Sequence, residues 1–119
     1  MQDYANLKVW QKGHALTLAV YDKTRSFPRI EMFGLTSQIR RACASIPANI
    51  AEGCGRVGRR ELAYFLNVAL GSASELDYHL RLAHDLGMLD DASHGRLAAD
   101  LVEIKRMLCG LLKKLRDGL

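Results

Sequence analysis

Five arginines gather in the middle of the chain, and they are the side chains best suited to chemistry with an anion. They lie between residues 40 and 60 against a single acid, Glu52, and are Arg40, Arg41, Arg56, Arg59 and Arg60. A guanidinium group carries a permanent charge and presents a planar fork of N–H donors to a phosphate or a carboxylate. The whole chain has a net charge of +4, so this segment holds an excess as large as that of the entire sequence. We therefore take these arginines as candidates for binding nucleic acid or another anion.

Two of these arginines occupy the predicted first turn of a helix. Gly58 is the best candidate for the N-cap, and Arg59 and Arg60 follow it directly. Cations are mildly unfavourable at this end of the helix dipole, so local stability does not explain them. Free backbone N–H groups, the dipole and the guanidinium forks would together favour an anion. The alternative is that the arginines pair with Glu31, Glu52 or Glu61, or with acids of a neighbouring subunit, and both interpretations stay open.

No other group of residues has the pattern of a catalytic or metal site. The four histidines lack the spacing of a ligand pair, and the three cysteines include no CxxC pair. No lysine-bearing phosphate loop is present, and no nucleophile, base and orienting residue come together. We therefore expect a non-enzymatic protein with no cofactor, no metal and no small-molecule substrate.

Four helices are expected to position the arginines. Apolar residues recur at spacings of three and four, and no alternating strand pattern persists. The spacing predicts helices over residues 7–26 and 35–52, a third between Gly58 and Gly87, and a fourth from about Asp90 onward. Helices of this length joined by short loops predict an all-α fold, an antiparallel up-down-up-down four-helix bundle. A second basic run, at residues 113–116, suits the negative end of the last helix dipole.

Pro47 lies within the second predicted helix and is expected to kink it. A proline has no N–H to donate to the carbonyl four residues before it, and its ring crowds that carbonyl. The apolar spacing nevertheless keeps its phase across the proline, so we predict a helix that is kinked but continuous. Asn49 and Glu52 are placed to satisfy backbone groups freed by the kink, and Gly53 and Gly55 are the expected stop.

The composition is that of a soluble globular protein. The chain has 119 residues, of which 49% are apolar and 25% are charged, so a single domain over residues 1–119 is expected. No apolar run is long enough to span a bilayer, and the first residues lack the apolar segment of a signal peptide. With cysteines that form no spaced pair, these features favour the cytoplasm, reduced thiols and no membrane contact.

The third and fourth predicted helices carry more apolar residues than one core seam needs. A wide core-facing stripe within a single bundle would absorb them. An exposed apolar face of that size would instead pack on another subunit, and we favour this homo-oligomeric interpretation. The residues concerned are Tyr64, Phe65, Val68, Leu70, Tyr78, Leu82, Val102, Met107 and Leu112.

Three segments carry a resemblance to a known family. They read LKVWQKG, SFPRIEMFGLTSQIRRACASIPANIAEGCGR and ELAYFLNVALGSASEL. Over about residues 4–115 the chain resembles the bacterial four-helix-bundle family that includes proteins encoded in intervening sequences of 23S ribosomal RNA genes. SIPANIAEG and ALGSASEL are its most specific segments, whereas Gly58 departs from the Ser or Thr that members often carry.

The resemblance implies an assembly as well as a fold. Some members form closed five-membered rings, which makes a homo-pentamer the expected assembly. Related accessory proteins of diversity-generating retroelements form basic barrels that bind a reverse transcriptase and nucleic acid. The leading hypothesis is thus a non-catalytic oligomer that binds RNA or a ribonucleoprotein partner through the five arginines, mainly at phosphates.

A protein-interaction scaffold is the alternative hypothesis. In that case the arginines would contact an acidic partner or close the assembly itself. The helices show no helix-turn-helix spacing and no aromatic platform for stacking bases, so reading of a specific base sequence is not expected under either hypothesis.

Overall fold

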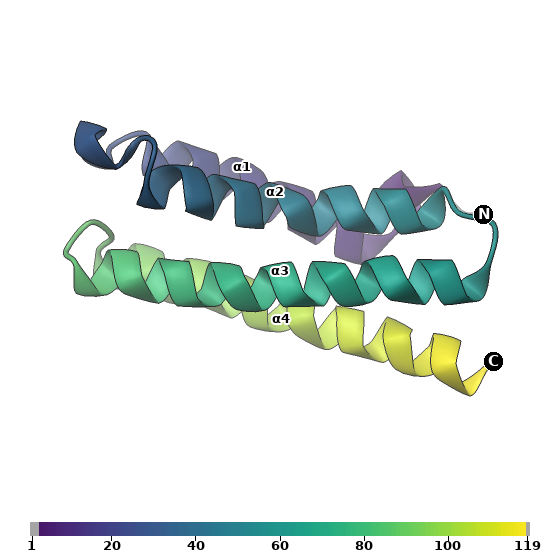
Figure 1. The fold of residues 1–119 in the computed structure, drawn as a ribbon. Helices are drawn as coiled ribbons and strands as arrows, with labels where there is room; N and C mark the ends of the chain where they lie inside the picture. The colour runs from purple at the N-terminus through teal and green to yellow at the C-terminus, as the bar shows by residue number, and fades with distance from the viewer. Residues whose placement is uncertain (1–2, 119) are drawn as a thin grey trace.

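The computed structural model describes residues 3–118, and this part of the chain is all-helical. Its elements are η1 (Tyr4–Asn6), α1 (Lys8–Thr24), η2 (Arg29–Glu31), α2 (Leu35–Cys54), α3 (Arg59–Asp85) and α4 (Asp91–Asp117). The four long helices lie side by side in a bundle that measures 45 × 23 × 20 Å (Figure 1). The predicted all-α, four-helix fold is confirmed.

Contacts between α1 and α2 pair residue numbers that run in opposite directions. Gly13, in the first half of α1, faces Pro47 in the second half of α2. Arg40, near the start of α2, bonds to Thr24 at the end of α1. In Figure 1 the start of α1, the α2–α3 turn and the end of α4 lie at one end of the bundle, and the other connections lie at the opposite end. These contacts support the expected up-down-up-down order.

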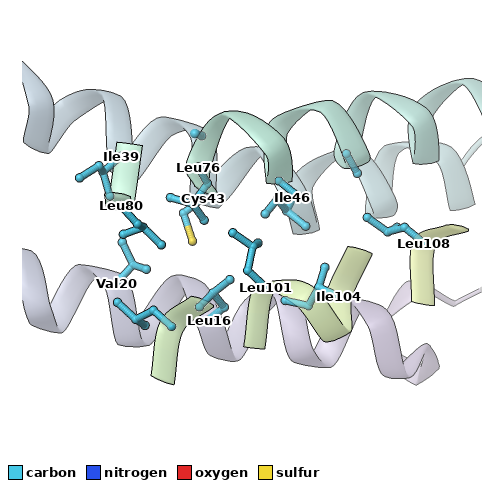
Figure 2. Close-up of a cluster of buried hydrophobic side chains, with 14 of the residues drawn as sticks. Leu16, Val20, Ile39, Cys43, Ile46, Leu76, Leu80, Leu101, Ile104 and Leu108 are labelled. Atoms are coloured by element: carbon cyan, nitrogen blue, oxygen red, sulfur yellow. The ribbon is translucent and has the colours of Figure 1, made fainter. Parts of the chain in front are cut away.

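An apolar seam fills the space between the four helices (Figure 2). Its largest members are almost completely buried and fall at the spacings of three and four that predicted the helices. They include Leu16, Ile39, Ile46, Ile50, Leu66, Leu76, Leu80, Leu101, Ile104 and Leu108. Three leucines that continue the same spacing, Leu62, Leu111 and Leu115, are only half-buried. The core is thus closed along most of the bundle and more open toward the end of α4.

The helix α2 runs without a break through Pro47, as predicted, whereas the kink stays a prediction. The carbonyl of Cys43 would normally accept the N–H of residue 47, which proline lacks. On α1, Thr17 Oγ1 lies 3.4 Å from that carbonyl and 2.8 Å from the carbonyl of Gly13. Its hydroxyl hydrogen is therefore available to both oxygens. A neighbouring helix supplies the donor that α2 lacks.

The roles of Asn49 and Glu52 differ from those expected at the proline. Asn49 Nδ2 donates to the carbonyl and to the hydroxyl of Ser45, each at 2.8 Å, so the amide reaches back one turn. The Ser45 hydroxyl also lies 2.8 Å from that of Ser72, which joins α2 to α3. Glu52 instead accepts a hydrogen bond from Arg56 at 2.8 Å. Neither side chain serves the Cys43 carbonyl, because both lie beyond its reach on the next turn.

Gly53 lies inside α2 and does not end it. A Cβ at this position would be 3.0 Å from both Leu62 Cδ1 and Phe65 Cβ, and 3.3 Å from the carbonyl of Leu62. Glycine is therefore needed here because α3 approaches closely. The helix ends at Gly55, whose φ of −80° is right-handed, so the expected stop holds for only one of the two glycines.

The ends of α3 and α4 follow the predicted signals. Gly58 is the N-cap of α3 with an extended backbone, and Gly87, at a φ of 79°, turns the chain after α3. Only glycine adopts such a positive φ without strain. Asp90 caps α4, because its Oδ1 accepts the N–H of Ser93 at 2.7 Å.

Replacing Thr17 with valine should lower the free energy of unfolding by about 1–2 kcal/mol, because the carbonyl of Cys43 then loses the hydroxyl group that faces it from α1. In a Pro47→Ala background the N–H of residue 47 returns, so the same substitution should cost less. Urea unfolding of the full double-mutant cycle measures this coupling. An equal cost of Thr17→Val in both backgrounds would show that Thr17 does not serve the carbonyl.

The turn between α3 and α4 holds a histidine between two carboxylates. His84 Nε2 lies 2.6 Å from Asp91 Oδ1, and His84 Nδ1 lies 3.3 Å from Asp85 Oδ1. The hydrogen bond with Asp91, and then the one with Asp85, raises the pKa of His84 above its ordinary value of 6.5. The ring of His94 stacks on His84 at a centroid distance of 4.6 Å. This cluster ties the start of α4 to the end of α3.

The raised pKa of His84 predicts a pH-dependent stability. Its stabilising effect is complete below the unfolded pKa and is lost as the pH rises through the higher folded pKa. We therefore expect His84→Gln to lower Tm at about pH 5.5 and to change it little at about pH 8.5. Thermal unfolding of both proteins at the two pH values is the measurement. The same Tm difference at both would contradict the ion pair.

Candidate nucleic-acid interface

One end of the bundle concentrates positive charge. The first turn of α1, the α2–α3 turn and the last turns of α4 meet there, so segments far apart in sequence lie close together (Figure 1). We call the cations of these segments the basic end, and they are Lys8, Arg56, Arg59, Arg60, Lys113, Lys114 and Arg116. The acids of the same segments are Asp3, Glu52, Glu61 and Asp117. Cations thus outnumber acids at this end.

Arg56 is held by groups of its own chain. Its Nη2 lies 2.8 Å from Glu52 Oε2 and its Nε 3.9 Å from Glu61 Oε2. Its guanidinium carbon lies 5.1 Å from the ring centroid of Phe65. Such exposed pairs contribute about 0–1 kcal/mol each. The alternative interpretation, in which the arginines pair with acids, therefore holds for Arg56. Its ion pairs link the end of α2 to the start of α3.

Arg59 and Arg60 occupy the first turn of α3, and both side chains are exposed. The Nη1 of Arg59 lies close to Gly118, the C-cap of α4, in the space that a Cβ on this glycine would occupy. Among residues 3–118, neither arginine forms a salt bridge. Gly58 gives the helix no side-chain cap, so the first N–H groups of α3 have no acceptor from the N-cap side chain, and Arg59 and Arg60 follow Gly58 directly in the chain. This is the arrangement of donors that suits a phosphate.

The last turns of α4 contribute cations that sequence position did not group with the arginines. Lys113, Lys114 and Arg116 are exposed, and Arg116 Nε lies 3.7 Å from Asp117 Oδ1. Lys114 borders a groove of about 300 Å³ between α1 and α4. Lys113 and Arg116 border a second groove, of about 610 Å³, between α3 and α4. The basic run at residues 113–116, which suits the helix dipole of α4, is thus also part of the basic end.

Arg40 and Arg41 lie away from the basic end. They are about 20 Å along the axis of α2 from its last residue. Arg40 Nε donates to Thr24 Oγ1 at 2.8 Å, and its guanidinium carbon lies 4.7 Å from the ring centroid of Tyr21. Arg41 is exposed and lines a groove between α2 and α3. The structure therefore brings three of the five predicted arginines together and leaves these two on the sides of the bundle.

Most of the additional apolar residues of α3 and α4 are half-buried. A wide core-facing stripe accounts for Phe65, Val68, Leu70, Leu82, Met107 and Leu112. The remaining three are exposed, Tyr64 at 63%, Tyr78 at 60% and Val102 at 55%. Only these three of the predicted residues leave a large part of their apolar surface exposed on α3 and α4.

An apolar tip at the opposite end of the bundle was missed in the sequence. In the connection between α1 and α2, Ile30 is 88% exposed, Met32 50% and Phe33 95%. The signal for it was available, since the segment RIEMF has three large apolar residues with no helical stripe to bury them. Exposed residues of this kind, close together, are typical of a contact surface.

Among residues 3–118, no three His, Cys, Asp or Glu side chains lie close enough together to hold a metal ion. Over the same residues, no helix is both long and apolar enough to cross a membrane. Burial raises the pKa of the Cys43 thiol to about 11 and raises that of Cys54, whereas Cys109 is exposed.

Comparison with known proteins gives one family and one well-matched fold. Residues 5–110 match the family model of the 23S rRNA-intervening sequence protein. A crystal structure of a protein of unknown function, from the S23 ribosomal protein family of Bacteroides thetaiotaomicron VPI-5482, has a TM-score of 0.82 and 25% sequence identity. The match covers 88% of this chain and 95% of that chain. No curated protein matches the sequence.

Proposed function

The chain belongs to the 23S rRNA-intervening sequence protein family, and from this premise we propose that it is a non-catalytic, homo-oligomeric bundle that binds RNA or a ribonucleoprotein through its basic end. One observation carries the proposal. Arg59 and Arg60 on α3 lie at the same end of the bundle as Lys113 and Arg116 on α4, although about 50 residues separate the two pairs in sequence. Lys and Arg side chains clustered on one surface are the electrostatic footprint of a nucleic-acid-binding protein.

Phosphate contacts are the chemistry that this cluster favours. Guanidinium and ammonium groups donate hydrogen bonds to phosphate oxygens, and neutralising each phosphate releases a counterion. Such contacts position a nucleic acid without reading its base sequence. The affinity should therefore depend steeply on salt concentration.

An oligomer would present several copies of the basic end to one RNA molecule. The exposed side chains of Tyr78 and Val102 support a subunit contact, because large apolar groups gain by leaving water. A closed ring of five copies would repeat the basic end around one axis, and avidity would then raise the overall affinity. We expect a particle of five times the 13.3 kDa chain mass.

The test is binding of a fluorescently labelled RNA hairpin with unpaired flanks, followed by anisotropy between about 50 and 200 mM salt. We expect the logarithm of the binding constant to fall linearly with the logarithm of the salt concentration, with a slope of about −3 for four phosphate contacts. Light scattering on the same sample gives the mass. Absent or salt-independent binding would contradict the RNA proposal, and the mass of a single chain would contradict the oligomer.

A protein-interaction scaffold is the second candidate function, and the apolar tip favours it. Ile30 and Phe33 are almost fully exposed, which suits a protein contact better than a nucleic acid. Under this alternative, Ile30→Ser with Phe33→Ser would disrupt assembly, and neutralising Arg59 and Arg60 would do the same. Intact assembly in both variants, with loss of RNA binding in the arginine variant alone, would favour the RNA proposal.

A further inference from the structure

We propose that the groove between α3 and α4 at the basic end binds one unpaired nucleotide, with the base on its apolar floor and the phosphate on its cations. This inference rests on the proposed function, since it names the form of nucleic acid that the basic end takes. The groove has a volume of about 610 Å³, within the range of small-molecule sites. It is lined by Ala63, Asn67, Cys109, Leu112, Lys113 and Arg116.

The lining combines the three chemistries that a nucleotide presents. Ala63, Leu112 and the Cys109 side chain form an apolar surface for the face of a base. The Asn67 carboxamide has both donors and an acceptor, so it can pair with the edge of a base. Lys113 and Arg116 stand beside them as partners for a phosphate. Charge and polarity thus match an anionic group attached to a flat, largely apolar ring.

A stacking surface continues from the groove along α3. Arg60, Tyr64 and Asn67 share one face of the helix, because residues three, four and seven apart are neighbours on a helix surface. Tyr64 is 63% exposed, and its ring packs at an angle of 85° to that of Phe65 with a centroid distance of 5.0 Å, so its exposed part can stack on a base that flanks the bound nucleotide. A single exposed tyrosine beside the groove would serve one flanking base, whereas the wider aromatic platform of a sequence-reading module stays unexpected. Arg60 stands one turn before this ring, where the next phosphate would pass.

Two other grooves between long helices lack one part of this set. Between α1 and α4, the only polar side chains are Lys8 and Lys114, which have no acceptor for a base edge. Between α2 and α3, Glu75 lies in the lining and would repel a phosphate. The groove between α3 and α4 alone among these three joins an amide, an apolar floor and cations.

The occupant is an unpaired nucleotide and not a duplex. In a duplex each base has its faces stacked and its pairing edge occupied, so it cannot enter a groove between two helices. A base outside a stack offers both its face and its edge. Single-stranded RNA should therefore bind more tightly than a duplex of the same total charge.

Protection of Cys109 from alkylation tests the site directly. Cys109 is exposed in the groove, whereas Cys43 and Cys54 are buried, so N-ethylmaleimide should modify Cys109 first. We expect a short single-stranded RNA to slow this modification by about tenfold at saturation, and a blunt duplex of equal charge to slow it little. Anisotropy on the same samples reports whether each RNA is bound at all.

The outcomes separate this inference from the proposed function. Salt-dependent binding of the single strand without protection of Cys109 would overturn the nucleotide site and leave RNA binding intact. Binding of neither RNA would overturn both. If Cys109 is already unreactive in the free protein, and becomes reactive on dilution, a second copy covers the groove and the nucleotide site is wrong.

A pair of variants gives a second readout. Asn67→Leu keeps the size of the side chain but removes the amide, so single-strand affinity should fall by about tenfold. Ser74→Leu places the same residue on the exposed side of α3 outside the groove and should leave affinity unchanged. Circular dichroism checks that both variants fold. Equal affinities in the two variants would contradict a role for Asn67.

Discussion

Replacing Ile46 with alanine should lower the free energy of unfolding by about 2–5 kcal/mol. Ile46 is fully buried midway along α2, where it points into the seam between the helices (Figure 2). Its Cγ2 lies 3.4 Å from the position that a Cβ on Gly13 would occupy, so α1 and α2 pack closely at this point. Truncation removes apolar contacts and leaves a cavity that the rigid helices cannot close. Urea unfolding followed by circular dichroism measures the loss.

Ile30→Ala is the matched control, because it removes the same atoms from a side chain that is 88% exposed. Its effect should stay within about 0.5 kcal/mol. A loss of stability at Ile30 as large as that at Ile46 would contradict the assignment of the core. A small loss at both positions would show that α1 and α2 do not pack through Ile46.

Neutralising Arg59, Arg60, Lys113 and Arg116 together should weaken RNA binding by on the order of 10³-fold at low salt. Each cation lost removes one charge-assisted contact with a phosphate, and the salt dependence should become shallower by about one unit of slope per contact. Because all four side chains are exposed, their replacement by alanine should leave the fold intact. Anisotropy titrations at several salt concentrations measure both quantities.

The control removes the same number of charges from the opposite end of the bundle. Its four substitutions to alanine fall on exposed cations, and these are Arg25, Arg29, Arg81 and Arg96. Net charge then changes equally in the two variants, so a purely non-specific attraction predicts equal losses. We expect the control to retain most of the affinity and slope of the unmodified protein. Equal losses in both variants would mean that no single end of the bundle holds the RNA.

The fold followed from the sequence because helix periodicity and helix ends are local properties. Spacings of three and four placed Ile39, Ile46 and Ile50 on one buried face without any knowledge of their partners. Gly58 and Gly87 marked the two ends of α3 through backbone preferences that act within a few residues. The apolar phase across Pro47 likewise predicted a continuous α2.

The interactions of Pro47 required the third dimension. The donor for the Cys43 carbonyl is Thr17, which lies on α1, 26 residues away in sequence. Asn49 is the nearby residue that the sequence suggested for the freed carbonyl, but its amide donates to the carbonyl of Ser45 instead. Sequence spacing gives the residues that share a helix face, whereas it does not say which neighbouring helix faces them. The same reason explains why the close approach of α3 to Gly53 was not foreseen.

The candidate site was only partly predictable for a related reason. Arg40 and Arg56 are close in sequence, but the rise of 1.5 Å per residue in a helix separates them along α2. Lys113 and Arg116 are far from Arg59 in sequence, yet the bundle returns α4 to the start of α3. Glu31 illustrates the same limit, since it caps α2 through a hydrogen bond of 3.0 Å to the N–H of Leu35 and does not pair with an arginine.

The most direct measurement compares two pairs of arginines on the same RNA. Both pairs were candidates in the sequence, but Arg59 and Arg60 lie at the basic end and Arg40 and Arg41 lie on the sides of the bundle. Replacing Arg59 and Arg60 with alanine should make the salt slope shallower by about two, and replacing Arg40 and Arg41 should leave it unchanged. A larger change of the salt slope on replacing Arg40 and Arg41, or equal changes in both variants, would contradict RNA binding by the basic end.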